Sequence, residues 1–483
     1  MIVKADGPDP ESLEQSKERG KGRFDAGRPC GILVRGSPTA RMGRTDSSAC
    51  TNASRPSDPS NAYNADFNNG NINNDDKGND NNNMARCARS AESGSIFGFG
   101  SLYRSYLACR RGKRSTFNAL RFEQDLEENL LRLEQELKGK TYKPKRSVCF
   151  TVTKPKPREI FAADFRDRIV HHVLVSRLEK IFEPLFIFDS WACRKCKGTH
   201  AAVKRLQSFM RTATLGGKQR AYYLQLDVSN FFMTIDKAAL FGIISRYVKD
   251  KDVLWLAETL IFHDPADNYI QRSPPDIASL VPKHKSLINA PEGKGLPIGN
   301  YSSQFLANVY LNELDQFIKH ELKCRFYLRY VDDLVLLSGS REELDSWRLK
   351  IADFLNRELL LSLRPEYKLR TVTNGVDFLG YVTRPGYILP RGRIVRNFVE
   401  KLSNWEHQDI WQLQASLNSY MGHLKHADSR RLVAGLAEKH PWLKNYFTLS
   451  KGVFKLKFRN VAAGLTPLQS FFRFAHNLNM MVS

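Results

Sequence analysis

The chain has 483 residues, of which 42% are hydrophobic, so it is long enough for two or three domains that each bury a core. Lysine and arginine number 74 against 51 aspartate and glutamate residues, and the resulting net charge of +23 favours a polyanionic partner, either nucleic acid or an anionic membrane surface. No apolar run reaches the roughly 18 residues that a membrane span needs, and residues 1–28 are polar, so we expect no transmembrane helix and no secretory signal.

Residues 1–95 are predicted to be a disordered, low-complexity tail. They are rich in Gly, Ser, Pro, Asp and Arg and show no hydrophobic period. Eleven of the 23 residues from Asn61 to Asn83 are asparagine, which is typical of a polar tract without a core.

Order is expected from about Ser95. Apolar residues recur at helical spacing over Phe117 to Leu137, which predicts an amphipathic helix that ends at Gly139. The basic, proline-containing stretch from Lys140 to Arg158 is predicted to be extended or hairpin-like. Helical spacing returns over Asp164 to Phe182.

The rest of the chain alternates between strands and helices. A buried strand is predicted over Ala221 to Leu226, a helix over Asn300 to Lys319 and another strand over Val376 to Val382. Phe326 to Leu337 is predicted to be strand–turn–strand. After Pro390 the pattern is helical and basic again.

The chemistry points to Asp332 and Asp333, which stand at the predicted turn between two nearly continuous apolar runs. Adjacent carboxylates repel each other, and loss of water strengthens the repulsion, so a divalent cation would stabilise them. An ordinary Asp-containing turn is the alternative. Such turns, however, use Asp-Gly or Asn-Gly between alternating polar residues. We therefore predict a metal site that is flanked by buried apolar residues.

A third acid, Asp227, follows the apolar run Tyr222 to Leu226. Three carboxylates at the ends of adjacent strands can hold two Mg²⁺ ions about 3.5–4 Å apart, one activating an attacking hydroxyl and the other stabilising a leaving pyrophosphate. Mg²⁺ prefers oxygen ligands, and this group offers Asp and no His. We expect two Mg²⁺ ions, for which Mn²⁺ can substitute.

At this point the sequence resembles the reverse transcriptase family. Tyr330-Val331-Asp332-Asp333 is similar to the metal-binding box, and the stretch from Asp227 to Phe232 is similar to the first-aspartate box. Further segments resemble the fingers motif, a bacterial-branch motif, the substrate-contacting loop and helix, and the primer-grip hairpin: Lys154 to Ile160 with Asp167-Arg168, Gly198 to Ala201, Leu296 to Gln304, and Phe378 to Tyr381. All of them occur in family order, over about residues 96–400.

The resemblance implies an α+β, right-hand polymerase fold. The tail of residues 1–95 would precede fingers and palm over residues 96–385, with an antiparallel sheet plus helices, and a helical basic thumb over residues 386–483 would follow. The implied activity is that of an RNA-directed DNA polymerase, a nucleotidyltransferase. The thumb residues Arg391, Arg393, Arg396 and Lys401 would face the duplex, with a solvated basic face as the alternative.

The resemblance also implies roles for single residues. Metal would be bound by Asp227, Val228, Asp332 and Asp333, and the triphosphate by Lys156 and Arg158. Phe232 would exclude a 2′-hydroxyl, whereas Phe231 is expected in the core. Lys368 stands at the place of a proton donor to pyrophosphate, with a solvated lysine as the alternative. Substrate contacts are also implied for Ile298, Gly299 and Gln304.

Within the family, Ile298-Gly299-x-x-x-Ser303-Gln304 resembles the reverse transcriptases of diversity-generating retroelements, which copy a template RNA with errors at adenines. Most other members have Gln at the first position and Pro at the last. The resemblance therefore implies that this protein is bacterial or phage-encoded and works in the cytoplasm. Its Asn-rich tail would be either disordered protein or template DNA read in frame, with Met84 as a later start.

Three alternatives remain open. The first is a reverse transcriptase of a group II intron, retron or phage-defence system. The second is a non-catalytic RNA-binding scaffold, and the third, a membrane-surface protein, is the least expected. The implied partners are template RNA, nascent cDNA, dNTPs and a small basic accessory protein. Cys193 and Cys196 form a CxxC pair without a second ligand pair nearby, so two inert thiols are expected rather than zinc.

Overall fold

A computed structural model describes residues 95–111, 116–449 and 454–458. The predicted tail therefore lies outside the described residues, apart from Ser95, and so does the C-terminal part of the predicted thumb. Within the described ranges, no helix is both long and apolar enough to cross a lipid bilayer.

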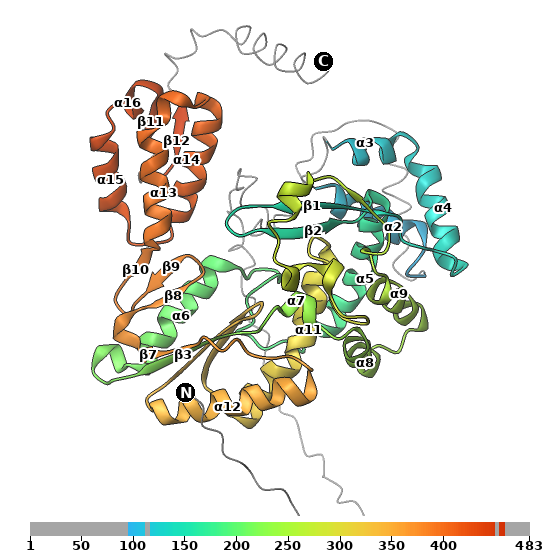
Figure 1. Cartoon of the computed structure of the whole chain (residues 1–483), viewed down its shortest axis with the longest axis horizontal. Coiled ribbons are helices and arrows are strands. Elements are labelled where there is room, and N and C mark those ends of the chain that lie inside the picture. Colours follow the sequence, from blue (N-terminus) through green and yellow to red (C-terminus); the bar gives the residue numbers. More distant parts are fainter. Residues whose placement is uncertain (1–94, 112–115, 450–453, 459–483) are drawn as a thin grey trace, which may run out of the picture. The chain divides into compact units, whose positions relative to one another are not determined.

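A four-stranded antiparallel sheet carries the three predicted acids (Figure 1). Its strands lie in the order β5-β6-β3-β7, with the bounds β3 Tyr222–Asp227, β5 Phe326–Tyr330, β6 Asp333–Ser338 and β7 Lys368–Thr371. The strand predicted over Ala221 to Leu226 and the strand–turn–strand predicted over Phe326 to Leu337 are both confirmed, within one residue at each end.

Both faces of this sheet are buried. On one face Tyr223, Val335 and Leu337 share a cluster with the apolar residues of α6 (Thr199–Ala213). On the other face, Leu224 and Leu336 lie in the main core, and α12 (Arg341–Glu358) packs against β3 and β6. Successive residues of a strand point to opposite faces, so a strand that is covered on both sides needs apolar residues at nearly every position. This explains the unbroken apolar runs beside the acids.

The N-terminal described region combines four helices with a small sheet. The helices are α2 Phe99–Arg110, α3 Phe117–Gln124, α4 Leu126–Lys138 and α5 Phe165–Phe182. The sheet has the order β2-β1-β4, with β1 Ser147–Val152, β2 Arg158–Ala162 and β4 Tyr269–Gln271. The antiparallel β1–β2 hairpin confirms the expected hairpin in the basic stretch, and α5 confirms the helix expected there.

The single helix predicted over Phe117 to Leu137 is wrong, because the structure has two helices with a break at Asp125. Asp125 has φ −121° and ψ 50°, which is outside the helical region. The Nδ2 of Asn129 donates to the carbonyl of Phe122 across the break, at 3.1 Å. Apolar spacing reports which residues share a buried face, but it does not detect one non-helical residue between them.

The remaining helices in the middle of the chain pack mainly on one another and on α5 (Figure 1). Their bounds are α7 Phe231–Thr234, α8 Lys237–Tyr247, α9 Lys251–Phe262, α10 Pro275–Ala278 and α11 Tyr301–Gln316. The helix predicted over Asn300 to Lys319 is confirmed as α11, which continues into a π-helical turn over Phe317–Glu321.

The C-terminal described region begins with a sheet of order β10-β9-β8, formed by β8 Val376–Phe378, β9 Tyr381–Thr383 and β10 Ile388–Pro390. The single strand predicted over Val376 to Val382 is wrong, because Leu379 and Gly380, with φ +50° and +87°, turn the chain into a hairpin. The elements that follow are α13 Gly392–Ser403, α14 Ile410–Leu424, α15 Arg430–Lys439, α16 Leu443–Tyr446, β11 Phe447–Leu449 and β12 Leu456–Phe458. They share a hydrophobic cluster of their own.

Candidate active site

The sheet brings the three acids together at one edge. Asp227, the last residue of β3, lies directly opposite Asp333, the first residue of β6. Asp333 also pairs with Tyr330 of β5, so the hairpin turn consists of Val331 and Asp332. Asp332 lies within hydrogen-bonding reach of Asp227. The strand register therefore places Asp227 opposite Asp333, and the turn brings Asp332 to Asp227.

A buried ion pair supports the turn that carries Asp332. Val331 has φ +55°, which is an outlier for a β-branched residue. Its carbonyl accepts a hydrogen bond from Nη1 of Arg329 at 3.0 Å. Arg329 is fully buried, and its Nη2 lies 2.6 Å from Oδ2 of Asp315 in α11, whose other oxygen accepts from the Tyr327 hydroxyl. Removing either charge would leave the other buried and unpaired, so the pair fixes the turn firmly.

Burial and mutual repulsion raise the pKa of the acids. Burial first, and then the charges of Asp227 and Asp333, raise the pKa of Asp332 to about 7. Burial first, and then Asp227, raise the pKa of Asp333 to about 6. The pKa of Asp227 is also raised by burial, although the positive charge of Arg364 opposes the shift. The ionised trio is therefore unfavourable by itself near neutral pH, and a bound cation would stabilise it.

The donor chemistry of this edge fits Mg²⁺. It consists of carboxylate oxygens, and the buried aliphatic Val228 can add only its backbone carbonyl. Among the described residues, no group of three or more His, Cys, Asp or Glu side chains is arranged to hold an ion by itself. An open set of this kind suits Mg²⁺, which usually keeps several waters and completes its shell with substrate phosphates.

The predicted triphosphate-binding residues lie on the β1–β2 hairpin. Lys156 is in its turn and Arg158 begins β2, and both side chains are exposed. The charge of Lys156 lowers the pKa of Asp227, and the charge of Arg158 lowers the pKa of Asp332. The fold therefore brings both cations within electrostatic reach of the acids, although they precede them by about 70 or more residues.

Two further cations come from the segment that enters β7. Nη1 of Arg364 lies 2.8 Å from Oδ2 of Asp227, and its backbone N–H donates to the Asp227 carbonyl at 2.8 Å. Lys368 is the exposed first residue of β7, and its charge lowers the pKa of Asp333. The sequence identified Lys368 as a candidate but missed Arg364, because a single arginine in an irregular segment has no pattern that distinguishes it.

Gly299 packs directly against β2. It has φ +127°, and a Cβ there would lie 2.8 Å from both the carbonyl oxygen of Phe161 and Cγ2 of Ile160. The N–H of Phe161 donates to the carbonyl of Ile298 at 2.9 Å. The loop before α11 thus joins the backbone of the hairpin that carries Lys156, and only glycine fits at the point of contact.

Ile298 and Phe232 share one apolar cluster, in which Phe161, Met233 and Leu287 are buried. The half-buried ring of Phe232 lies 5.4 Å from the ring of Phe231. Phe231 is 2% exposed, as expected for a core residue. Ile298 therefore packs against the same apolar cluster as Phe232, the residue expected to exclude a 2′-hydroxyl.

Gln304 lies in the first turns of α11 and is half-buried. Its Oε1 accepts a hydrogen bond from Sγ of Cys193 at 3.3 Å. Burial raises the pKa of the Cys193 thiol to about 11, so the thiol stays protonated and can donate. The Gln304 amide is thus fixed from the side of the CxxC segment.

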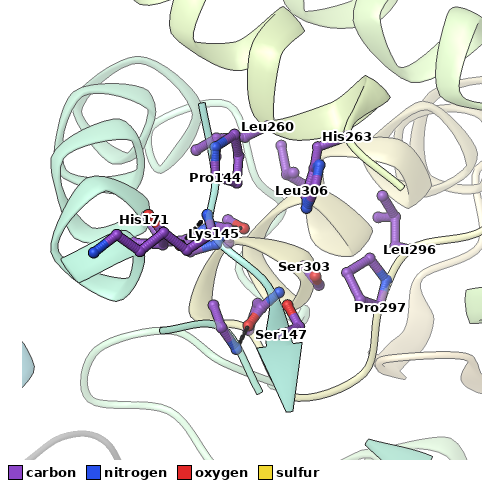
Figure 2. Close-up of a pocket in the computed structure, with 14 residues that line it drawn as sticks. Pro144, Lys145, Ser147, His171, Leu260, His263, Leu296, Pro297, Ser303 and Leu306 are labelled. Carbon is purple, nitrogen blue, oxygen red and sulfur yellow. Dashed lines mark hydrogen bonds between the residues drawn. The ribbon is translucent and has the colours of Figure 1, made fainter. Parts of the chain in front are cut away.

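A small pocket lies behind the loop, on the side of Leu296 and Pro297 (Figure 2). It is lined by His171 from α5, whose Nδ1 lies 2.7 Å from Oγ of Ser302. Burial first, and then His172, lower the pKa of His171 to about 3, so the ring is neutral. The three acids do not line this pocket. Its polar pair fastens α5 to the first turn of α11, which supports the loop from behind.

The β8–β9 hairpin contacts α6 and α14 through Tyr381. The Tyr381 hydroxyl donates to the carbonyl of His423 at 2.9 Å and lies 3.0 Å from Nδ1 of His200. The His423 ring stacks on Tyr381 with ring centroids 4.1 Å apart, and His200 stacks on His426 at 3.7 Å. Burial lowers the pKa of His200 to about 3 and that of His426 to about 4. This neutral cluster joins the hairpin to the helical region that follows it.

Among the four basic residues expected to face a duplex, Arg391 forms an ion pair with Asp377 of β8. Its Nη2 lies 2.5 Å from Oδ1 of Asp377. Arg393, Arg396 and Lys401 belong to α13.

Comparisons with known proteins bear on this site. A family model described as reverse transcriptase (RNA-dependent DNA polymerase) matches residues 143–383. The group II intron-encoded protein LtrA of Lactococcus lactis subsp. cremoris is 27% identical over 203 residues, which cover 41% of this chain and 30% of that protein. Protein YkfC of Escherichia coli (strain K12) is 23% identical over 271 residues, which cover 49% of this chain and 66% of that protein. The chain thus spans less than two thirds of either relative.

Two more comparisons reach other organisms. Nuclear intron maturase 1, mitochondrial, of Arabidopsis thaliana is 22% identical over 316 residues, which cover 50% of this chain and 44% of that protein. Among solved structures, apo telomerase from Candida tropicalis matches with a TM-score of 0.38 and 11% identity, over 51% of this chain and 55% of that chain.

Proposed function

Because residues 143–383 of this chain form a reverse transcriptase domain, with the mixed α+β architecture of the right-hand polymerases, we propose that the protein is an RNA-directed DNA polymerase. It would copy an RNA template into cDNA from dNTPs. The observation that carries the proposal is the convergence of Asp227, Asp332 and Asp333 at one sheet edge, faced by cations from the β1–β2 hairpin. A non-catalytic RNA-binding scaffold would have no need to retain all three acids.

Different residues of the proposed active site would bind the metal ions and the triphosphate. Mg²⁺ bound by Asp227, Asp332, Asp333 and the Val228 carbonyl would supply charge neutralisation at the reacting phosphate. Lys156 and Arg158 hold the triphosphate by charge, because cations stabilise the negative charge that develops on a transferring phosphoryl group.

Two more residues act at either end of the nucleotide. Lys368, near Asp333, gives a proton to the leaving pyrophosphate. Phe232, which packs against the same apolar cluster as Ile298, stands against the sugar and leaves no room for a 2′-hydroxyl.

Primer extension on an RNA template tests the activity. Asp332→Asn keeps the shape of the side chain but removes one charge, so extension with Mg²⁺ should fall by at least two orders of magnitude, as losses of single groups that act in the transition state do. Asp353→Asn, an exposed substitution on α12, is the control and should extend like the parent. Extension by Asp332→Asn at the parent's rate would show that the acids are not the catalytic centre.

We further propose that the copying is inaccurate at template adenines, as in a diversity-generating retroelement with a small basic accessory protein. Ile298 supports this, because it has no donor or acceptor with which to hold the incoming nucleotide, whereas a Gln could contribute one hydrogen bond worth about 0.5–1.5 kcal/mol. The loss of one such hydrogen bond is too small to explain heavy misincorporation alone, so template geometry or the accessory protein must contribute as well. The relatives LtrA and the intron maturase favour the alternative, a group II intron reverse transcriptase.

Sequencing of cDNA copied from a defined RNA separates the two readings. Errors concentrated at adenine and reduced in Ile298→Gln would support adenine-mutagenic copying. Errors spread evenly over the four template bases, with the accessory protein present, would favour the intron-type enzyme.

A further inference from the structure

We propose that Lys285 is an additional triphosphate-binding residue of this active site and that Glu159 is the positioning residue that holds it there. The inference rests on the proposed polymerase function. Lys285 belongs to a 3₁₀ turn, Lys283–Lys285, in the segment between α9 and the Gly299 loop. This segment lies outside every motif that resembles the family.

Glu159 joins this segment to the β1–β2 hairpin. Glu159 is buried, and its Oε2 accepts from the Ser286 hydroxyl at 2.7 Å, while its Oε1 accepts from the Leu287 N–H at 2.7 Å. Leu287 is itself buried in the apolar cluster that contains Phe161 of β2. Both carboxylate oxygens of one buried acid are thus used to fix the two residues that follow Lys285.

The same strand presents a cation on its other face. Arg158 is exposed and lies within electrostatic reach of Asp332, while its buried neighbour Glu159 binds the two residues that follow Lys285. Arg158 and the carboxylate that holds the Lys285 segment are therefore adjacent residues of β2. A change in the hairpin that moves Arg158 would move Lys285 with it.

The charges around Lys285 identify the class of ligand. The half-buried Lys285 lies within electrostatic reach of Arg364, Lys156 and Arg158, as well as Asp227. Burial first, and then the three positive charges, lower the pKa of its ammonium group. Four like charges gathered beside one carboxylate repel one another, and a ligand with several negative charges would relieve that repulsion.

A nucleoside triphosphate fits this arrangement. Asp227 marks the place at which the α-phosphate would react, and the cations of the hairpin and of the Lys285 segment lie within electrostatic reach of one another, where they could bind the β- and γ-phosphates. A phosphate of the template backbone has the same chemistry but one charge. The experiment therefore measures nucleotide and RNA binding separately.

The test compares Lys285→Ala with Lys283→Ala, an exposed lysine of the same turn. Equilibrium binding of a fluorescent dNTP to the full-length protein on an RNA template with a DNA primer, with Ca²⁺ in place of Mg²⁺, reports affinity without chemistry. Lys285→Ala should weaken dNTP binding about tenfold or more, as expected for one charge-assisted hydrogen bond. Lys285→Arg should recover most of the loss, and Lys283→Ala should bind like the parent.

Steady-state extension supplies the second readout. Lys285→Ala should raise KM for dNTP more than it lowers kcat, and it should leave RNA affinity unchanged. Equal dNTP binding by Lys285→Ala and Lys283→Ala would overturn the proposal, and a loss of RNA affinity instead of dNTP affinity would assign Lys285 to the template backbone. The binding measurement does not depend on catalysis. A parent protein without extension activity would therefore disprove the polymerase proposal, whereas the dNTP-binding comparison would still decide the role of Lys285.

Glu159→Gln tests the positioning role. It keeps the size of the side chain but weakens one of the two hydrogen bonds, so dNTP binding should fall less than in Lys285→Ala. In the double variant the two losses should not add, because both act through the same ammonium group. Full additivity, at an unchanged melting temperature, would show that Glu159 does not act through Lys285.

Discussion

The guanidinium of Arg364 lies 2.8 Å from Oδ2 of Asp227, so one of the three acids already has a cationic partner from its own chain. The backbone N–H of Arg364 also donates to the Asp227 carbonyl, which fixes the two residues relative to each other. A charge at this distance competes with any metal ion for the same carboxylate.

Replacing Arg364 by Gln should therefore tighten binding of Mg²⁺ to the nucleotide-free protein. The expected change is roughly threefold to tenfold, the size of one ion pair of this partly exposed kind. Titration calorimetry measures it directly. Arg370→Gln, on an exposed position of β7, is the control. Unchanged or weaker Mg²⁺ binding in Arg364→Gln would mean that the arginine does not compete with the ion.

Asp332→Asn should stabilise the metal-free protein although it strongly reduces synthesis. The folded-state pKa values of Asp332, about 7, and Asp333, about 6, lie above their ordinary value of 3.8, so the folded state holds protons more tightly than the unfolded state. The contribution of these two carboxyl groups to the free energy of unfolding is thus fully present below about pH 4, and it is lost as the pH rises through 6 to 7.

At pH 8 in EDTA, Asp332→Asn should melt a few degrees higher than the parent, because one of the repelling charges is gone. The difference should shrink at pH 5.5, where Asp332 of the parent is protonated. Differential scanning fluorimetry at the two pH values decides this, and a lower melting temperature of the variant at pH 8 would contradict the repulsion.

Gly299→Ala should be destabilising because a Cβ would meet the β2 backbone at 2.8 Å. We expect a loss of about 1–3 kcal/mol in the free energy of unfolding and a drop in extension of about tenfold or more, since the loop and the hairpin must move apart. Gly293→Ala is a matched control, because Gly293 also has positive φ, +71°, but open space around it. Chemical denaturation of both variants separates the clash from the backbone strain.

Phe232→Ala should admit ribonucleotides. The half-buried ring packs against the apolar cluster that also contains Ile298, so truncation opens space without removing a fully buried core residue. Discrimination between dNTP and rNTP, measured as the ratio of kcat/KM values, should fall by roughly tenfold or more. Equal discrimination by parent and variant would return Phe232 to a packing role.

The His200 cluster should make the protein sensitive to acid. The folded-state pKa values of His200, about 3, and His426, about 4, lie below the ordinary value of 6.5, so stability is present above about pH 6.5 and is lost as the pH falls towards those values. Burial is the main cause of these lowered pKa values, and the positive charges of Lys204 and Lys425 oppose protonation of the rings further.

Replacing His200 by Asn should reduce the fall in melting temperature between pH 7 and pH 5. His284→Asn changes an exposed histidine and should leave the fall unchanged. Equal acid sensitivity in all three proteins would show that the cluster does not govern it.

The sequence by itself determined the elements whose signals are local. The apolar runs before Asp227 and around Asp332-Asp333 predict strands that are buried on both faces, and the strands form there. A hairpin fixes its own register through its short turn, so the position of Asp332 and Asp333 follows from neighbouring residues alone. The break at Asp125 and the turn at Leu379-Gly380 escaped the same reasoning, because one residue outside a pattern leaves the pattern intact.

Only the tertiary structure decided which cations and supports surround the acids. Arg364 meets Asp227, Glu159 holds the segment after Lys285, and Arg329 pairs with the Asp315 of a different element. The first two contacts join segments that are far apart in the sequence, the third joins neighbouring elements, and each depends on a single side chain. Periodicity reports burial averaged over many residues, whereas an ion pair depends on which elements become neighbours, and that is determined by the packing of the whole core.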